Sequence, residues 1–300
     1  MVRPSLFETM SPWPKITLVT PAFNSAPYIE QTFRSVVYQD YPNLEYIVVD
    51  GGSTDGTVEI IKKYERHFAW WTSEPDQGMY DAINKGFSRS TGEIMGWISG
   101  TDMLHLGSLF VLGEVFSTFP EVEWITGIPT GFNEKGMTVG VARKPPRWSR
   151  VRFLAGANHW IQQESTFWRR GLWKRTGGYV DATRRNGNDF ELWVRFFRQA
   201  KLYPVNALIG GYRKHPDSLG EAIDKEECNR VHREVIEAEI KRNGTTQVLK
   251  SFYCLGKFMK RIPKVRWLWQ RFVVKGLHHI PGPDWPPVIE YREGRWVMRR

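Results

Sequence analysis

Short apolar segments alternate with segments of helical periodicity over the first hundred residues, and this alternation constrains the fold more than any other feature. The apolar, strand-like segments cover residues 16–20, 44–49, 68–72 and 93–98. The segments with a helical spacing of apolar residues cover residues 29–37, 58–64 and 79–90. Strands that alternate with helices form right-handed βαβ units and a parallel sheet. The sequence therefore predicts an α/β fold.

Polar, turn-forming clusters follow three of these strands, at residues 20–24 (TPAFN), 50–53 (DGGS) and 99–102 (SGTD). The carboxyl ends of parallel strands meet at one edge of a sheet, which is where ligands bind in open α/β folds. We therefore expect the three clusters to line one crevice. Asp50 and Asp102 also have a simpler interpretation, because Asp favours turns and helix N-caps. Asn24 and Pro27 are typical of a helix start.

Composition excludes several classes of protein. No Gly-x-Gly-x-x-Gly and no Walker A motif follows the first strand, so a nucleotide would not be held by a glycine-rich phosphate loop. No apolar run of transmembrane length and no signal-peptide core is expected. Cys228 and Cys254 lie far apart, which predicts neither a disulfide framework nor a zinc site and fits a reducing compartment. A formal charge of +10 predicts an acidic partner: nucleic acid, anionic lipid or a phosphorylated substrate.

Three motifs together resemble the inverting glycosyltransferases of family 2. They are TPAFN at residues 20–24, YIVVDGGSTDGT at residues 46–57 and SEPDQGMYDAINKG at residues 73–86. The third is similar to a subgroup that builds bacterial capsule, exopolysaccharide and lipopolysaccharide chains. The resemblance implies a GT-A fold, with a Rossmann-like, mixed but mainly parallel sheet flanked by helices. It implies a catalytic domain over residues 1–220, divided into a nucleotide-sugar half (15–104) and an acceptor half (105–220).

The resemblance also implies a nucleotide-sugar donor, for which UDP is the expected nucleotide, and a divalent cation, Mn²⁺ or Mg²⁺. The residues that it places at the donor are Thr20, Pro21, Ala22, Asn24, Asp50, Gly51, Asp81, Lys85, Gly100, Thr101 and Arg213. It makes Asp102 and His215 the metal ligands. The family's metal motif usually carries two acids, whereas this chain keeps Asp102 alone and has Gly100 and Thr101 before it. This departure predicts weaker metal binding, and it leaves a metal-independent or a non-catalytic protein open.

The acceptor half carries the expected base. Residues 188–196 resemble the family's acidic pair followed by an amphipathic helix, with Asn188 in place of Glu. Asp189, in the first helical turn where the helix dipole favours a carboxylate, is the expected base for the acceptor hydroxyl. Glu191 is the alternative base, and a simple N-capping role for Asp189 is the structural alternative. The acceptor-binding residues that the resemblance suggests are Trp160, Gln163 and Glu191.

Two further strands are expected in this half, over residues 123–128 and 202–209. The C-terminal region, residues 221–300, is expected to be helical and basic. Its cations gather where acidic residues are lacking, at Lys257, Lys260, Arg261, Lys264, Arg266, Arg271 and Lys275. Apolar residues between 265 and 273 fall on one face of a helix that would begin near Pro263. This predicts a helix on an anionic membrane surface, and packing against the catalytic domain is the alternative.

The resulting hypothesis is the transfer of a sugar, with inversion, from a nucleotide-sugar to a hydroxyl of a saccharide or polyprenyl-linked acceptor. Such a protein would act in cell-surface polysaccharide biosynthesis, in the cytoplasm and peripherally on the inner face of the membrane. Nucleic acid is not an expected partner, because no recognition motif is present. A non-catalytic nucleotide- or sugar-binding homologue is the second hypothesis. A nucleotidyltransferase that uses a sugar 1-phosphate and a nucleoside triphosphate is the third.

Overall fold

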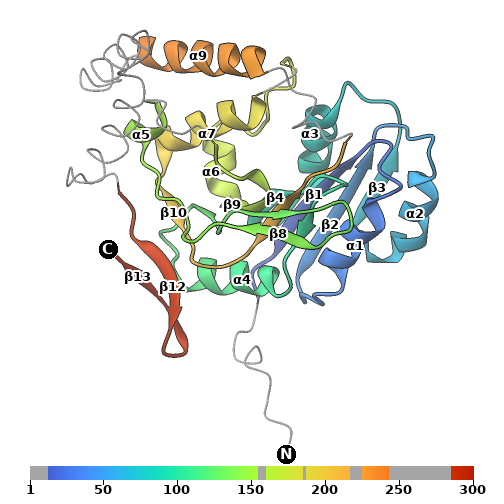
Figure 1. Cartoon of the computed structure of the whole chain (residues 1–300), viewed down its shortest axis with the longest axis horizontal. Helices are drawn as coiled ribbons and strands as arrows, with labels where there is room; N and C mark the ends of the chain where they lie inside the picture. Colours follow the sequence, from blue (N-terminus) through green and yellow to red (C-terminus); the bar gives the residue numbers. More distant parts are fainter. Residues whose placement is uncertain (1–12, 155–159, 185–186, 217–224, 243–284) are drawn as a thin grey trace, which may run out of the picture.

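The computed structural model describes residues 13–154, 160–184, 187–216, 225–242 and 285–300. A seven-stranded sheet with the order β10-β6-β9-β4-β1-β2-β3 forms its centre (Figure 1). The strands of this sheet are β1 (Ile16–Ala22), β2 (Leu44–Asp50), β3 (Trp70–Ser73), β4 (Ile94–Trp97), β6 (Trp124–Thr126), β9 (Thr166–Arg169) and β10 (Leu202–Pro204).

Most neighbouring strands of this sheet run in parallel. The pairs β1–β2, β2–β3, β1–β4 and β6–β10 are parallel, whereas β9 is antiparallel to both β4 and β6. Every residue of β1 is buried, as expected for a strand covered on both faces. The predicted α/β fold with a mixed, mainly parallel sheet is therefore confirmed.

Helices cover both faces of the sheet. One layer contains α1 (Ile29–Val37), α2 (Thr57–Tyr64) and α4 (Ser108–Thr118), whose buried side chains share one apolar cluster. The other contains α3 (Met79–Arg89), α5 (Arg150–Leu154), α6 (Arg170–Arg175), α7 (Asn188–Gln199) and α9 (Lys225–Lys241). Stacked indoles join this second layer to the sheet: the Trp193 ring of α7 stacks on Trp97 of β4 and on Trp124 of β6.

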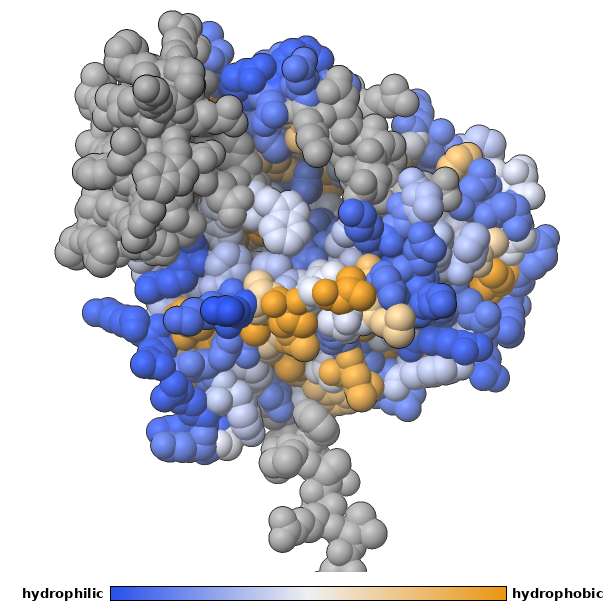
Figure 2. Space-filling model, viewed as in Figure 1, coloured by the Kyte–Doolittle hydropathy of each residue, from blue (hydrophilic) through white to orange (hydrophobic). Residues whose placement is uncertain are grey.

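A smaller sheet stands beside the main one and has the order β5-β11-β7-β8. Its strands are β5 (Met103–Leu104), β11 (Gly210–Arg213), β7 (Thr130–Phe132) and β8 (Thr138–Val141). Figure 2 shows an apolar patch over β8, where Met137, Val139 and Val141 are exposed. The predicted strand over residues 202–209 is wrong in part, because the chain forms β10, leaves the main sheet and continues as β11 in the smaller one.

The expectation of a wholly helical C-terminal region is also wrong. α9 fits it, but the chain ends in an antiparallel hairpin of β12 (Val288–Arg292) and β13 (Arg295–Arg299). Glu293 and Gly294 both have positive φ at the turn, as a type I′ hairpin requires. The hairpin packs on the domain, since Ile289 is fully buried and the Trp296 indole donates a hydrogen bond to Glu114 (2.6 Å).

The residues on which the membrane prediction depends, 257–275, lie outside the described part of the chain. Among the described residues, no helix has the length and hydropathy needed to span a bilayer.

Gly96 of β4 permits a close approach between β4 and β9. A Cβ at this position would lie 2.5 Å from the buried ring of Phe167 on β9. We expect Gly96→Ala to lower the free energy of unfolding by about 1–3 kcal/mol, because an overpacked core forces strained side chains. Urea unfolding would measure this. Gly140→Ala on exposed β8 is the control, since no atom lies within 4 Å of its Cβ; equal losses in the two variants would contradict the packing argument.

Candidate active site

A cavity of about 590 Å³ opens at the carboxyl edge of β1 and β4. Its size falls in the range of small-molecule sites. The wall includes Pro21 to Ser25, Pro27, Tyr28, Gly51, Asp76, Gly78 to Tyr80, Ala82, Trp97, Ser99 to Asp102, Gln163, Glu164, Asp189, Tyr212 and His215. Both predicted halves of the domain therefore contribute to one cavity, and the ends of β1, β2 and β4 meet at it as expected.

Asp50 organises the loop after β2 and does not face the cavity. Its buried carboxylate accepts hydrogen bonds from the backbone N–H groups of Gly52 (3.1 Å) and Ser53 (2.9 Å) and from the hydroxyls of Ser53 (2.5 Å) and Ser73 (2.7 Å). With its oxygens occupied in this way, Asp50 acts as a turn residue, and its expected donor contact is corrected. Gly51, the next residue, lines the cavity instead.

The loop after β1 follows the prediction in part. Pro21, Ala22 and Asn24 line the cavity. Thr20 does not, because its side chain is buried and its hydroxyl is 3.0 Å from the Tyr46 hydroxyl. Asn24 does not cap α1, which begins five residues later; it has a φ of 45° and its side-chain oxygen accepts from the backbone of the β2–α2 loop.

Asp81 and Lys85 lie on the outer face of α3, four residues apart, and neither lines the cavity. Lys85 forms an ion pair with Glu74 (2.8 Å), and Asp81 accepts a hydrogen bond from the Gln77 backbone (3.1 Å). Their expected contact with the donor is therefore corrected. Met79, Tyr80 and Ala82, on another face of α3, line the cavity instead. The helical period could have distinguished the two faces.

Asp76, and not Asp81, lines the cavity. The sequence analysis did not identify Asp76. Its carboxylate accepts a hydrogen bond from the Gly78 N–H (2.7 Å) and lies against Gly51. A Cβ at position 51 would be 2.9 Å from an Asp76 oxygen, so the close approach requires glycine there. In the sequence, Gly51 directly after Asp50 is the feature that could have indicated this close contact.

Asp102 lies at the floor of the cavity, after β4, and is 2% exposed. Its Oδ1 accepts a hydrogen bond from the Arg213 backbone N–H (2.7 Å), and the Thr32 hydroxyl donates to its carbonyl (2.7 Å). Burial, followed by the charge of Glu164, raises the pKa of Asp102 well above its usual range. Gly100 and Thr101 line the cavity beside it, as predicted.

The Arg213 side chain points away from the cavity, so its expected contact with a diphosphate is corrected. The fully buried guanidinium donates to the Gln31 side chain (2.8 Å) and the Glu134 carbonyl (3.2 Å), and it lies over the Tyr28 ring at 5.2 Å. Alternate residues of a strand face opposite sides, and Tyr212 is the one that lines the cavity.

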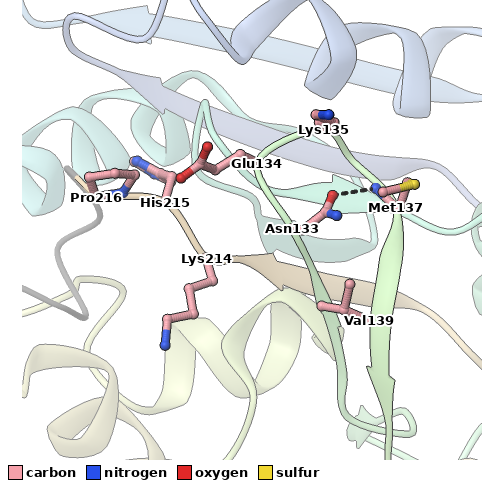
Figure 3. A pocket seen from close by; sticks show the side chains of 8 residues that line it. All are labelled: Asn133, Glu134, Lys135, Met137, Val139, Lys214, His215 and Pro216. Carbon is pink, nitrogen blue, oxygen red and sulfur yellow. Dashed lines mark hydrogen bonds between the residues drawn. The ribbon is translucent and has the colours of Figure 1, made fainter.

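His215 also lines the cavity, and its ring packs against Tyr28 with the centroids 4.4 Å apart. It borders a second, shallower hollow between β7, β8 and the end of β11, where it lies beside Glu134 (Figure 3). Among the described residues, no three His, Cys, Asp or Glu side chains form a metal site by themselves. One or two carboxylates completed by substrate phosphates are the usual protein contribution to Mg²⁺ binding. Asp102 and His215 therefore fit a cation that a diphosphate helps to hold.

Asp189 is the second residue of α7 and lines the cavity. Its Oδ1 accepts a hydrogen bond from the Phe190 N–H (2.8 Å). Burial raises the pKa of Asp189 above its ordinary value, which makes its carboxylate a stronger base. The neighbouring Asn188 holds the start of the helix by donating to the carbonyls of Asp181 and Arg184.

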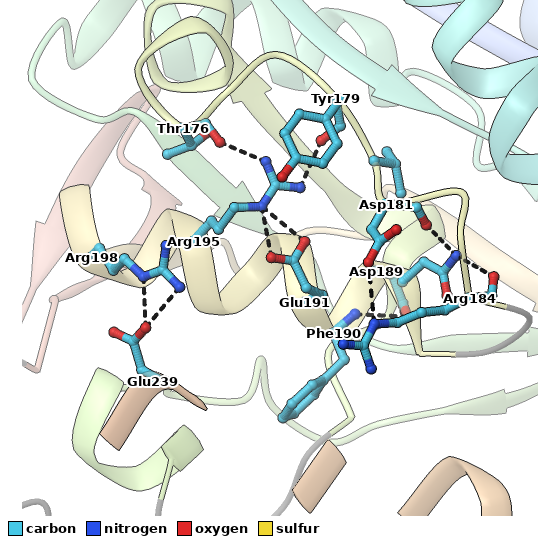
Figure 4. Close-up of polar contacts among 12 residues, drawn as sticks. Thr176, Tyr179, Asp181, Arg184, Asp189, Phe190, Glu191, Arg195, Arg198 and Glu239 are labelled. Atoms are coloured by element: carbon cyan, nitrogen blue, oxygen red, sulfur yellow. Dashed lines mark hydrogen bonds and ion pairs between the residues drawn. The ribbon is translucent and has the colours of Figure 1, made fainter. Parts of the chain in front are cut away.

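Glu191 is not in the cavity wall. Both of its oxygens accept hydrogen bonds from the Arg195 Nε (3.0 and 2.8 Å), and the same guanidinium donates to the Thr176 and Tyr179 carbonyls (2.6 and 2.7 Å; Figure 4). The expectations that Glu191 contacts the acceptor or acts as the base are therefore corrected. It belongs to an ion pair that fixes α7.

The turn η2 (Gln163–Ser165) brings two side chains into the cavity. Gln163 was predicted, and it donates to the Trp97 carbonyl (2.7 Å). Glu164 was missed, although it follows Gln163 directly. Trp160, expected at the acceptor, is 55% exposed and outside the cavity wall, so that expectation is corrected.

Comparisons with known proteins agree with this geometry. The family model "Glycosyl transferase family 2" matches residues 17–104. An uncharacterized glycosyltransferase of Mycobacterium tuberculosis (strain ATCC 25618 / H37Rv) is 33% identical over 175 residues, which are 57% of this chain and 64% of the relative. The putative teichuronic acid biosynthesis glycosyltransferase TuaG of Bacillus subtilis (strain 168) is 35% identical over 99 residues, which are 31% of this chain and 38% of the relative. The chain thus covers less than two thirds of either relative.

Solved structures share the fold at low sequence identity. Staphylococcus aureus TarS 1–349, in complex with UDP-GlcNAc, has a TM-score of 0.62 and 14% identity, with 95% of this chain and 96% of that chain covered. The mannosyltransferase PcManGT from Pyrobaculum calidifontis, in complex with GDP-Man and Mn²⁺, has a TM-score of 0.52 and 16% identity, with 88% and 86% covered. Residues 17–104 thus match the glycosyl transferase family 2 model, and the chain shares the GT-A fold of these solved structures.

Proposed function

We propose that this protein transfers a sugar from a nucleotide-sugar to a hydroxyl of a saccharide or polyprenyl-linked acceptor, with inversion at the anomeric carbon. The observation that carries the proposal is the cavity that Asp102 and Asp189 both line. In this proposal Asp102 serves the donor and Asp189 the acceptor. An inverting transfer needs one carboxylate against the attacking hydroxyl and a means of offsetting charge on the leaving group.

The donor would enter between the β1–α1 loop and the start of α3. Pro21, Ala22 and Gly51 give that wall a small-residue, apolar surface, and Asp76 adds one carboxylate for the hydrogen-bond donors of a base or ribose. Structural neighbours hold UDP-GlcNAc or GDP-Man. Both are nucleotide-diphosphate sugars, which supports this donor class here and UDP as the first candidate.

In the proposed step, the Asp189 carboxylate takes the proton of the acceptor hydroxyl. The acceptor oxygen forms a bond to the anomeric carbon while the bond from that carbon to the phosphate oxygen breaks on the opposite face, and the electron pair leaves with the nucleoside diphosphate. Asp102 and His215 would hold Mn²⁺ or Mg²⁺, which when bound supplies positive charge for the leaving diphosphate. The buried position of Asp189 favours proton uptake, because burial disfavours its charged form.

A non-catalytic nucleotide-binding homologue is the second candidate. The observation that favours it is the replacement of the usual second acid by Thr101, next to Asp102. Such a protein would bind a nucleoside diphosphate in the same cavity without turnover, so an activity assay separates the two candidates.

Asp189→Asn should lower the rate of sugar transfer by at least about 100-fold, because the amide cannot accept the proton that a general base removes. Nucleotide affinity should stay within about twofold, since Asp189 serves the acceptor in this proposal. Transfer assays and calorimetry measure the two effects. Glu191→Gln is the matched control, because Glu191 is outside the wall, and it should retain most activity. An Asp189→Asn enzyme with normal turnover would remove Asp189 from the mechanism.

We also propose that the protein acts on the inner face of the cell membrane, in cell-surface polysaccharide biosynthesis. The cationic, periodically apolar sequence of residues 257–275 supports the membrane contact, and the similarity to TuaG, a putative teichuronic acid biosynthesis glycosyltransferase, supports the pathway class. The attraction would be electrostatic as well as apolar, because cytoplasmic leaflets carry anionic lipids.

Replacing Lys264, Arg266, Arg271 and Lys275 with glutamine should release the protein from phosphatidylglycerol vesicles in a sedimentation assay. Removal of the whole C-terminus is unsuitable, because the β12–β13 hairpin packs on the domain. The control replaces four exposed cations elsewhere, Lys62, Arg66, Lys174 and Arg230, and should leave binding unchanged. Equal vesicle binding by both variants would refute a specific role for residues 257–275.

A further inference from the structure

Glu164 places a third acidic side chain in the cavity, beside Asp102 and across from Asp189. The mechanism proposed above does not use it. Glu164 lies in the acceptor half of the chain, yet its carboxyl lies within hydrogen-bonding reach of that of Asp102. Two acidic side chains from opposite halves of the domain therefore meet at one point of the cavity floor.

Glu164 supplies an acidic side chain next to Asp102 that the loop after β4 lacks. The loop after β4 has Gly100 and Thr101 before Asp102, so it supplies one carboxylate only. A divalent cation next to a diphosphate is commonly held by one or two carboxylates in addition to the phosphate oxygens. The geometry offers Glu164 as the second carboxylate, next to the first.

The turn that carries Glu164 is held on both sides by side chains of its neighbours. Gln162 is buried, and its amide both accepts from the Thr130 N–H (2.8 Å) and donates to the Thr130 carbonyl (2.6 Å). Gln163 donates to the Trp97 carbonyl at the end of β4 (2.7 Å). These bonds attach the turn to the smaller sheet and to the main sheet at once.

The backbone of Glu164 itself is pressed against β11. The Ser165 hydroxyl donates to the Gly210 carbonyl (2.5 Å), and a Cβ at Gly210 would lie 2.1 Å from the Glu164 carbonyl oxygen. Glycine at 210 thus permits the contact. These hydrogen bonds hold the turn so that the Glu164 side chain, like that of Gln163, faces the cavity, and its direction is fixed before any ligand binds.

The electrostatics of the pair favour a cation. Asp102 is 2% exposed, and both carboxyls line the same cavity. Buried anions are costly unless they are paired or coordinate a metal ion. Arg213 donates its backbone N–H to Asp102, and its guanidinium, whose charge also acts on Asp102, donates its hydrogen bonds to Gln31 and the Glu134 carbonyl.

We propose that Glu164 is the second carboxylate ligand of the divalent cation at the donor site and replaces the acid that position 101 lacks. This inference rests on the proposed function. It makes the cation a link between the two halves of the domain, since one carboxylate comes from the β4–β5 loop and the other from the turn before β9. It also identifies Gln162, Gln163, Ser165 and Gly210 as the groups that position this ligand.

Mn²⁺ binding in the presence of UDP tests the proposal, with the free Mn²⁺ signal in electron paramagnetic resonance and calorimetry as readouts. E164Q should weaken Mn²⁺ binding at least about tenfold. Loss of a group that only hydrogen-bonds to a metal ligand already weakens binding by about that factor, and loss of a ligand should weaken it at least as much. Adding T101D to E164Q rebuilds an acidic pair in the β4–β5 loop and should restore Mn²⁺ affinity. E74Q, outside the cavity wall, is the control and should bind Mn²⁺ as the wild type does.

Thermal unfolding without metal checks that E164Q is folded, and we expect its midpoint to stay near that of the wild type, because a glutamine amide oxygen can still accept a hydrogen bond from Asp102. Should E164Q not fold, E164D withdraws the carboxylate by one methylene and must weaken Mn²⁺ binding. Wild-type Mn²⁺ affinity in a folded E164Q or E164D would overturn the assignment while leaving the proposed function intact. A wild-type protein that binds neither UDP nor Mn²⁺ with UDP would overturn both.

Discussion

The insertion of β9 between β4 and β6, antiparallel to both, is the constraint on which the site depends. Trp168 of β9 pairs with Met95 on one side and with Trp124 on the other, so a single strand joins β1–β4 to β6 and β10. Phe167 fills the space above Gly96, which sets the register. Because β9 is preceded at once by the turn η2, this pairing brings the Glu164 carboxyl to the floor of the cavity.

As a result of this packing, some charged residues stabilise the fold and others face the cavity. Several charged groups of the family-like motifs hold the frame: Asp50 closes a loop, Arg213 supports the β7–β8 turn region and Glu191 fixes α7 through Arg195. Fewer face the cavity, and burial raises the pKa of three of them, Asp102, Glu164 and Asp189, because it disfavours their charged forms. Perturbed carboxyls that converge in a cleft are a physical signature of a reactive or metal-binding site.

The sequence predicts the local features well. Alternating strands and helices indicate the α/β fold, and polar residues after β1 and β4 indicate where the cavity opens. The direction of a side chain is harder to predict from the sequence. The alternation of side chains along β11 turns Arg213 away from the cavity, and the helical period of 3.6 residues along α3 turns Asp81 away from it. Glu164 could not be assigned from its own segment, because its role depends on pairing between strands distant in sequence. The terminal hairpin did have a signal, the Glu293-Gly294 turn between two alternating segments.

The most direct test of the central claim is calorimetry of nucleotide binding to the wild-type protein, with UDP, GDP and dTDP, each in Mn²⁺ and in EDTA. The cavity described above predicts that one nucleoside diphosphate, with UDP as first candidate, binds in preference to the others and that EDTA weakens this binding. Binding that EDTA leaves unchanged would contradict the role of Asp102 and its neighbours in holding a cation. Failure of all three nucleotides to bind would contradict the assignment of this cavity as a nucleotide-sugar site.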